Sequence, residues 1–124
     1  MILADTSVWV DHLRQGDADL ARALEQGAIA IHPFVIGEIA LGHLKNRRDV
    51  LDLLAALPPA PQAEHDEVLH AVGQHQLAGR GLGWIDVHLL AATLLAADAR
   101  LWTRDKRLHA AATDLGVAWA PESH

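Results

Sequence analysis

The chain has no cysteine and no tyrosine, and its 124 residues include one phenylalanine. Without thiols it cannot form disulfides or thiolate metal sites, so any metal must be held by carboxylate or imidazole groups. The lack of cysteine also fits a reducing compartment. Because aromatic residues make up only 4% of the chain, we expect the four tryptophans to be core or dimer contacts rather than surfaces that stack on RNA bases. These are Trp9, Trp84, Trp102 and Trp119.

Long hydrophobic runs are also missing. The apolar run at residues 87–97 is too short to span a bilayer and contains His88. The apolar start contains Asp5 and has no basic lead, so it does not resemble a secretory signal. With 51% hydrophobic and 21% charged residues, and no linker-like stretch, we expect a soluble cytoplasmic protein with one domain over residues 1–124.

Positive charge is scarce, because 10 Lys and Arg stand against 16 Asp and Glu and give a net charge of −6. This balance argues against binding nucleic acid by bulk attraction. The argument from net charge weakens if divalent ions neutralise some acids, and the local potential can differ from the net charge. The basic residues cluster at two places, which are Lys45, Arg47 and Arg48, and then Arg104, Lys106 and Arg107.

Short apolar runs alternate with amphipathic segments, which predicts an α/β fold with a parallel sheet. Strands are expected at residues 2–4, 28–31, 100–103 and 117–119. Helices are expected at residues 7–14, 18–26, 33 to about 45, 48–57, 64–77, 85–97 and 105–115. In such folds ligands gather beyond the carboxyl ends of the strands.

Four carboxylates suit a shared metal site. Asp5 and Asp105 follow expected strands, Asp86 follows a glycine-rich loop, and Glu38 lies inside a helix. Side chains from four separate segments are a common way to supply hard oxygen ligands to Mg²⁺ or Mn²⁺. Four like charges a few ångströms apart would repel by roughly 1 to 4 kcal/mol per pair, so they require a cation. Such a site can activate water for attack on a phosphodiester.

Helix capping is a competing explanation for three of these acids. Asp5, Asp86 and Asp105 all lie at expected helix starts, where a carboxylate accepts from free N–H groups. Glu38 does not fit this explanation, because it lies a turn and a half into its helix on an apolar face, where a carboxylate needs a partner. That face also carries Phe34, Leu41 and Gly42.

Four segments carry a family resemblance. They are Leu-Ala-Asp-Thr-Ser-Val-Trp at residues 3–9, the helix at 33–42, Gly-Trp-Ile-Asp-Val-His-Leu-Leu-Ala-Ala at 83–92, and Leu-Trp-Thr-Arg-Asp-Lys-Arg-Leu at 101–108. Over nearly its whole length the chain resembles the PIN-domain ribonucleases, specifically bacterial VapC-type toxins. The resemblance implies a PIN-like three-layer α/β fold, with a short central parallel sheet flanked by helices.

The same resemblance implies a Mg²⁺- or Mn²⁺-dependent endoribonuclease, the toxin of a toxin–antitoxin pair, which leaves a 5′-phosphate on its RNA product. It implies a VapB-type antitoxin that blocks the site, and a homodimer. Asp5 and Asp86 would be the primary metal contacts, with Glu38 positioning water or metal and Asp105 completing the site. The accessory hydroxyls of the family match Ser7 and Thr103.

Several of these residues have simpler explanations too. Ser7 can cap a helix, and Thr103 can be a β-branched residue that ends a strand. The basic residues around Asp105, namely Arg104, Lys106 and Arg107, can meet RNA phosphate or form a solvated helix face.

The nine histidines invite a zinc interpretation. However, His65, His70 and His75 recur every five residues, about 140° apart on a helix, and so do not share one face. We interpret them as solvated. His88 lies next but one to Asp86, and we expect it to be packed or at the surface rather than part of the site.

Two rival functions remain. One is a non-catalytic module whose acidic pocket binds a basic partner peptide. The other is an aspartyl-phosphate phosphatase of the haloacid dehalogenase type, which also has an acid after its first strand. That family needs a second Asp two residues later, where this chain has Ser7.

Overall fold

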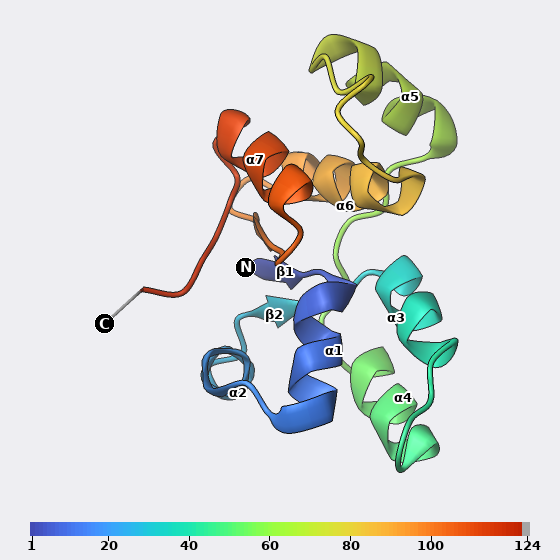
Figure 1. Cartoon of the computed structure of the whole chain (residues 1–124), viewed down its shortest axis with the longest axis vertical. Helices are drawn as coiled ribbons and strands as arrows, with labels where there is room; N and C mark the ends of the chain where they lie inside the picture. Colours follow the sequence, from blue (N-terminus) through green and yellow to red (C-terminus); the bar gives the residue numbers. More distant parts are fainter. Residues whose placement is uncertain (123–124) are drawn as a thin grey trace.

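The computed structural model describes residues 1–122 and shows a three-stranded parallel sheet with helices on both sides (Figure 1). The α/β prediction is therefore confirmed. The elements in chain order are β1 (Ile2–Ala4), α1 (Thr6–Gln15), α2 (Ala18–Glu25), β2 (Ile29–Ala30), α3 (Pro33–Ala40), α4 (Arg47–Ala55), α5 (His65–Gln74), α6 (Trp84–Leu95), β3 (Arg100–Trp102) and α7 (Lys106–Asp114).

The sheet has the order β2-β1-β3, so the first strand lies in the middle. Ile2 pairs with Ile29 on one side and with Arg100 on the other. In Figure 1, α6 and α7 lie above the strands, α1 to α4 lie below them, and α5 is outermost at the top. The three layers place the carboxyl ends of β1 and β3 side by side.

The expected strand at residues 117–119 was too long. Only Ala118 forms a bridge, to Leu101, and the backbone hydrogen bonds run from Leu101 N to Val117 O at 2.7 Å and from Trp119 N to Leu101 O at 2.9 Å. Pro121 follows closely and has no N–H to donate, which prevents the ladder from continuing.

The expected helix from residue 33 to about 45 was also too long, since α3 ends at Ala40. Leu41 N still donates to Gly37 O, and Gly42 N then donates to Ile39 O in a tighter turn. The side chain of Leu41 is 89% exposed, so the apolar period no longer faces the core. Without burial to support it, the segment leaves the helix at a glycine.

The core is built around β1 and α6. Residues 87–93 of α6 are all buried, which is the pattern of a helix surrounded by protein. Trp9 and Trp102 are buried as expected, and Trp119 packs on Trp102 with ring centroids 4.7 Å apart. Trp84 is not a core residue, because it is 40% exposed at the first residue of α6, so for this tryptophan the dimer contact stays a prediction. Within residues 1–122, no helix combines the length and the apolar character that a membrane crossing would need.

Candidate active site

Four carboxylates meet where β1 and β3 end and where α1, α6 and α7 begin. Asp5 is the N-cap of α1 directly after β1, and Asp105 is the N-cap of α7 after β3. Asp86 lies in the first turn of α6, and Glu38 lies in the second half of α3. Because parallel strands bring their carboxyl ends to one edge, these acids face a common region.

Asp5 is the most tightly held of the four and is only 6% exposed. Its Oδ2 accepts from Thr103 Oγ1 at 2.7 Å and from Ser7 Oγ at 2.9 Å, while its Oδ1 accepts from Thr6 N at 2.7 Å. Together these hydrogen bonds engage both oxygens of the carboxylate. Both predicted accessory hydroxyls therefore contact Asp5 and fix its orientation.

Glu38 finds its partner in Thr6, whose Oγ1 donates to Glu38 Oε1 at 2.8 Å. This hydrogen bond joins α3 to the first residue of α1. The sequence analysis missed Thr6, although its place beside Asp5 at a helix start could have indicated a role. The face around Glu38 is not buried as expected, because Phe34 is 38% exposed and Leu41 is 89% exposed.

The capping explanation is confirmed for three acids. Besides the cap made by Asp5, Asp86 Oδ2 accepts from Gly83 N at 3.0 Å and Asp105 Oδ1 accepts from Leu108 N at 2.9 Å. Capping does not exclude a second role. A capping carboxylate accepts from a backbone N–H through one oxygen, and its second oxygen can take part in another contact.

Asp86 interacts electrostatically with each of the three other carboxylates. Burial raises the pKa of Asp86, the Gly83 N–H partly offsets this, and the charges of Asp5, Asp105 and Glu38 raise it further. Among residues 1–122, none of these four acids forms an ion pair with a lysine or arginine. Within residues 1–122, no ion pair to a lysine or arginine offsets the repulsion on Asp86.

Clustered carboxylates are the donor type that Mg²⁺ and Mn²⁺ prefer, so the chemistry of this set fits a divalent cation. However, no three His, Asp or Glu side chains in residues 1–122 are arranged as a group that could hold a metal ion. The caps point one oxygen of each carboxylate at the backbone or at a hydroxyl. To share an ion, the side chains of Glu38, Asp86 and Asp105 would have to turn toward Asp5.

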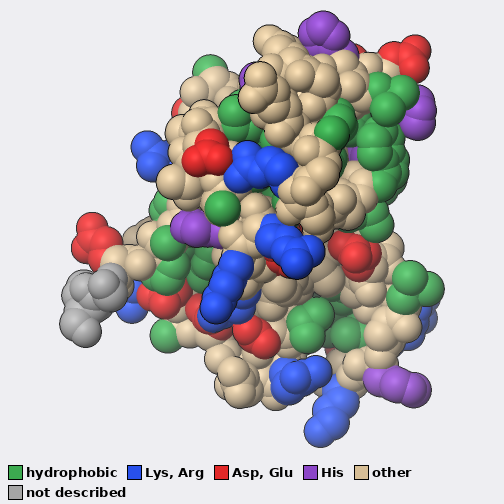
Figure 2. Space-filling view, turned by 45° about the horizontal axis from the view of Figure 1, so that its top comes forward, with side chains coloured by type: hydrophobic (Ala, Val, Ile, Leu, Met, Phe, Trp, Pro, Cys, Tyr) green, Lys and Arg blue, Asp and Glu red, His purple; other side chains and the backbone are tan. Residues whose placement is uncertain are grey.

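The three basic residues around Asp105 have different surroundings. Arg104 Nε lies 2.9 Å from Asp11 Oδ2, and its second nitrogen pairs with Asp17, so two acids neutralise its guanidinium. The guanidinium of Arg107 lies so close to Gly81 that a Cβ there would clash with it. Lys106 is exposed and makes no ion pair within residues 1–122. Figure 2 shows Lys and Arg side chains gathered in the middle of one face, with acidic side chains beside them.

The other basic cluster, Lys45, Arg47 and Arg48, lies elsewhere. It precedes and begins α4, at the end of the molecule opposite α5 (Figure 1). This distance separates it from the starts of α6 and α7, where the carboxylates gather.

Histidines and aromatic rings pack beside the carboxylates. His88 is 6% exposed, which confirms that it is packed, and its ring centroid lies 4.8 Å from Phe34 and 4.9 Å from Trp84. Burial and the nearby His65 lower the pKa of His88. His32 is 1% exposed, and burial together with His88 lowers its pKa to about 4. Both rings are therefore neutral at pH 7.

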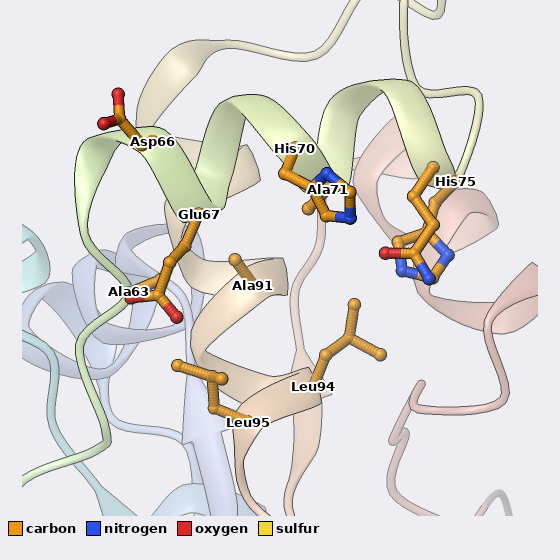
Figure 3. A pocket seen from close by; sticks show the side chains of 10 residues that line it. Ala63, Asp66, Glu67, His70, Ala71, His75, Ala91, Leu94 and Leu95 are labelled. Atoms are coloured by element: carbon orange, nitrogen blue, oxygen red, sulfur yellow. The ribbon is translucent and has the colours of Figure 1, made fainter.

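A groove of about 430 Å³ lies between α5 and α6, as Figure 3 shows. His70 of α5 and His75, the C-cap of that helix, face Leu94 and Leu95 of α6 across it. None of the four clustered acids lines this groove, and within residues 1–122 its histidines form no metal-binding group. The zinc interpretation of the histidine series is therefore not supported.

Comparison with known proteins agrees with this arrangement. The family model of the PIN domain matches residues 2–114. Two proteins named Ribonuclease VapC32, from Mycobacterium tuberculosis strains CDC 1551 / Oshkosh and ATCC 25618 / H37Rv, are each 55% identical over 122 residues, which cover 98% of this chain and 98% of each relative. The chain belongs to the PIN-domain family and, within it, to the VapC-type ribonucleases.

Proposed function

We propose that this protein is a divalent-metal-dependent endoribonuclease that hydrolyses RNA at the site formed by Asp5, Glu38, Asp86 and Asp105, and that it is the toxin of a type II toxin–antitoxin pair. The observation that carries the proposal is the electrostatic interaction of Asp86 with three carboxylates from other segments, none of which pairs with a lysine or arginine within residues 1–122. The identity to proteins named Ribonuclease VapC32 supports the reaction class.

Each acid has a distinct role in this proposal. Asp5, held by Ser7 and Thr103, and Asp86 would be the primary ligands of Mg²⁺ or Mn²⁺. Such an ion, when bound, lowers the pKa of a water and stabilises charge on the reacting phosphate. Glu38 would orient the attacking water through the oxygen that Thr6 leaves free, and Asp105 would complete the set.

RNA phosphates would be bound by the basic residues at the start of α7. Lys106 and Arg107 are both exposed there and follow Asp105 directly. Arg104 would meet phosphate only after leaving Asp11 and Asp17, so we expect it to contribute less than the other two.

The proposed partner is a VapB-type antitoxin, as the names of the relatives suggest. A homodimer is supported by exposed apolar side chains on neighbouring helices, since such surfaces commonly mark subunit contacts. They are Val10 and Leu13 of α1 and Leu41 after α3. A cytoplasmic location fits an RNA substrate and a chain without cysteine.

The proposal is tested with purified protein and end-labelled single-stranded RNA. We expect cleavage with Mg²⁺ or Mn²⁺, a 5′-phosphate on the product, and no cleavage after chelation. Asp5→Asn should abolish cleavage, whereas the matched control Asp52→Asn on α4 should cleave like the wild type. Wild-type protein that leaves RNA intact with every divalent ion, but binds basic peptides through the acidic site, would instead identify the non-catalytic module.

A further inference from the structure

Two aromatic rings are exposed beside the carboxylates, whereas two of the other three tryptophans are buried. Trp84 is 40% exposed and Phe34 is 38% exposed, whereas Trp9 and Trp102 are almost fully buried. Exposed apolar rings that share one place are a common sign of a binding surface. His88 lies between the two rings and contacts both edge-on, at 4.9 Å and 4.8 Å.

The two rings border the acidic cluster. Phe34 and Glu38 are four residues apart in α3, so they lie on the same helix face about one turn, roughly 5 Å, from each other. Trp84 and Asp86 are two residues apart in α6 and so lie on different helix faces, whereas Trp84 shares a face with His88, four residues on, which connects it to Phe34 beside Glu38. The first turns of α3 and α6 face each other, as the contact between Phe34 and His88 requires (Figure 1).

We propose that Trp84 and Phe34, with His88 between them, form a stacking platform for an unpaired RNA base next to the phosphate that is cleaved. This inference rests on the proposed ribonuclease function. Proteins read single-stranded RNA largely by stacking splayed bases on aromatic and histidine rings. Each such stack contributes about 1 to 3 kcal/mol and requires no charge.

The charge of the protein favours this occupant. The net charge is −6, the cleavage site is lined with carboxylates, and Arg104 is already neutralised by two acids. Phosphate contacts can therefore supply only part of the affinity for RNA. Uncharged stacking beside the acids would hold the strand where phosphate contacts are repelled.

The platform is also rigid and small. His65 packs against Trp84 at 5.2 Å, and His32 packs against Phe34 at 5.0 Å, so each exposed ring has a second packed neighbour. Rings held in place by packing bind with a smaller loss of conformational freedom. Two partly exposed rings present far less area than the roughly 800 Å² per partner of a stable protein interface, which favours a base over a second chain.

The test separates base recognition from cleavage. KM and kcat are measured on a single-stranded oligonucleotide for Trp84→Leu and Phe34→Leu, which keep apolar bulk but lose the ring. Each should raise KM about tenfold, which corresponds to about 1.4 kcal/mol, with a smaller change in kcat. Trp84→Phe retains a ring and should stay within about threefold of the wild type. Leu53→Ala, an exposed apolar control on α4, should leave KM unchanged.

A second measurement does not need cleavage. The Asp5→Asn protein is titrated with the same oligonucleotide and with one that has an abasic residue beside the cleavage site. Binding is followed by the intrinsic tryptophan fluorescence of the protein. The abasic strand should bind about tenfold more weakly. In the double variant that carries Trp84→Leu as well as Asp5→Asn, measured with labelled RNA, the two strands should bind equally.

Three outcomes would overturn the platform. They are an unchanged KM in both leucine variants, equal binding of the intact and abasic strands, or a KM loss that accompanies dissociation of a dimer in size-exclusion chromatography. The last would identify the surface as an interface between copies of this chain. A wild-type protein that binds bases but cuts no RNA would contradict the ribonuclease proposal instead, so the two failures are distinguishable.

Discussion

His32 makes folding sensitive to pH, and replacing it with asparagine should remove part of that sensitivity. His32 Nδ1 accepts from Phe34 N at 3.0 Å as the N-cap of α3, so its proton is on Nε2, which is buried without a partner. A second proton would have to enter a site that is 1% exposed and lies 6.5 Å from the ring of His88. The folded protein therefore resists protonation of this ring.

The magnitude follows from the lowered pKa. Burial first, and His88 second, lower the pKa of His32 from 6.5 to about 4. Between these pH values the unfolded chain binds a proton that the folded chain does not, so the free energy of unfolding falls as pH decreases. The stability is fully present above pH 6.5 and is lost toward pH 4. A shift of that size corresponds to about 3 kcal/mol in total.

The assay is urea unfolding at several pH values between 7 and 4 for the wild type and for His32→Asn. Asparagine can keep the cap on Phe34 N through its side-chain oxygen but does not titrate. The His32→Asn variant should be less stable than the wild type at pH 7 because the smaller side chain leaves a cavity. The difference in free energy of unfolding between the two proteins should narrow by about 3 kcal/mol toward pH 4. His70→Asn, an exposed control on α5, should track the wild type. A gap between wild type and His32→Asn that stays constant with pH would refute the reasoning.

Three other predictions concern the site and its supports. Asp86→Asn keeps the hydrogen bond from Gly83 N and removes one repelling charge. Without divalent ions its midpoint temperature of thermal unfolding should therefore rise, and Mg²⁺ should no longer stabilise the protein. A lower midpoint would contradict the repulsion on Asp86. Asp5→Ala should lose activity and also about 1 kcal/mol or more of stability, measured by urea unfolding, because it removes a helix cap, whereas Asp5→Asn should lose mainly activity. Gly81→Ala should lower stability by about 1 kcal/mol or more, because Gly81 has a φ of +77° and lies against Arg107; thermal unfolding unchanged from the wild type would exclude this strain.

Local patterns in the sequence predicted much of the fold. The apolar run of α6 predicted a buried helix, and residues 87–93 are indeed all buried. The predictions failed at the ends of two segments. α3 ends at Ala40 because Leu41 meets no core, and the segment at 117–119 forms a single bridge because Pro121 follows it.

The acidic residues show the same division. Their types and their places after strands or at helix starts identified four candidates, and the capping roles of three of them follow from the same positions. The partners could not be predicted. Thr103 reaches Asp5 from 98 residues away, and Thr6 reaches Glu38 from 32 residues away. Nothing in the local pattern around Arg104 indicated that Asp11 and Asp17 neutralise it.

Hydrophobic periodicity, turn residues and short motifs are local properties of the chain, so its strands and helices, its family resemblance and four candidate acids could be predicted from the sequence. Only the tertiary structure decided which hydroxyl holds which carboxylate, which arginine is already paired, and which rings reach the surface beside the acids. Those outcomes depend on contacts between segments far apart in the chain, where packing and desolvation, rather than residue type, set the geometry and the charge state.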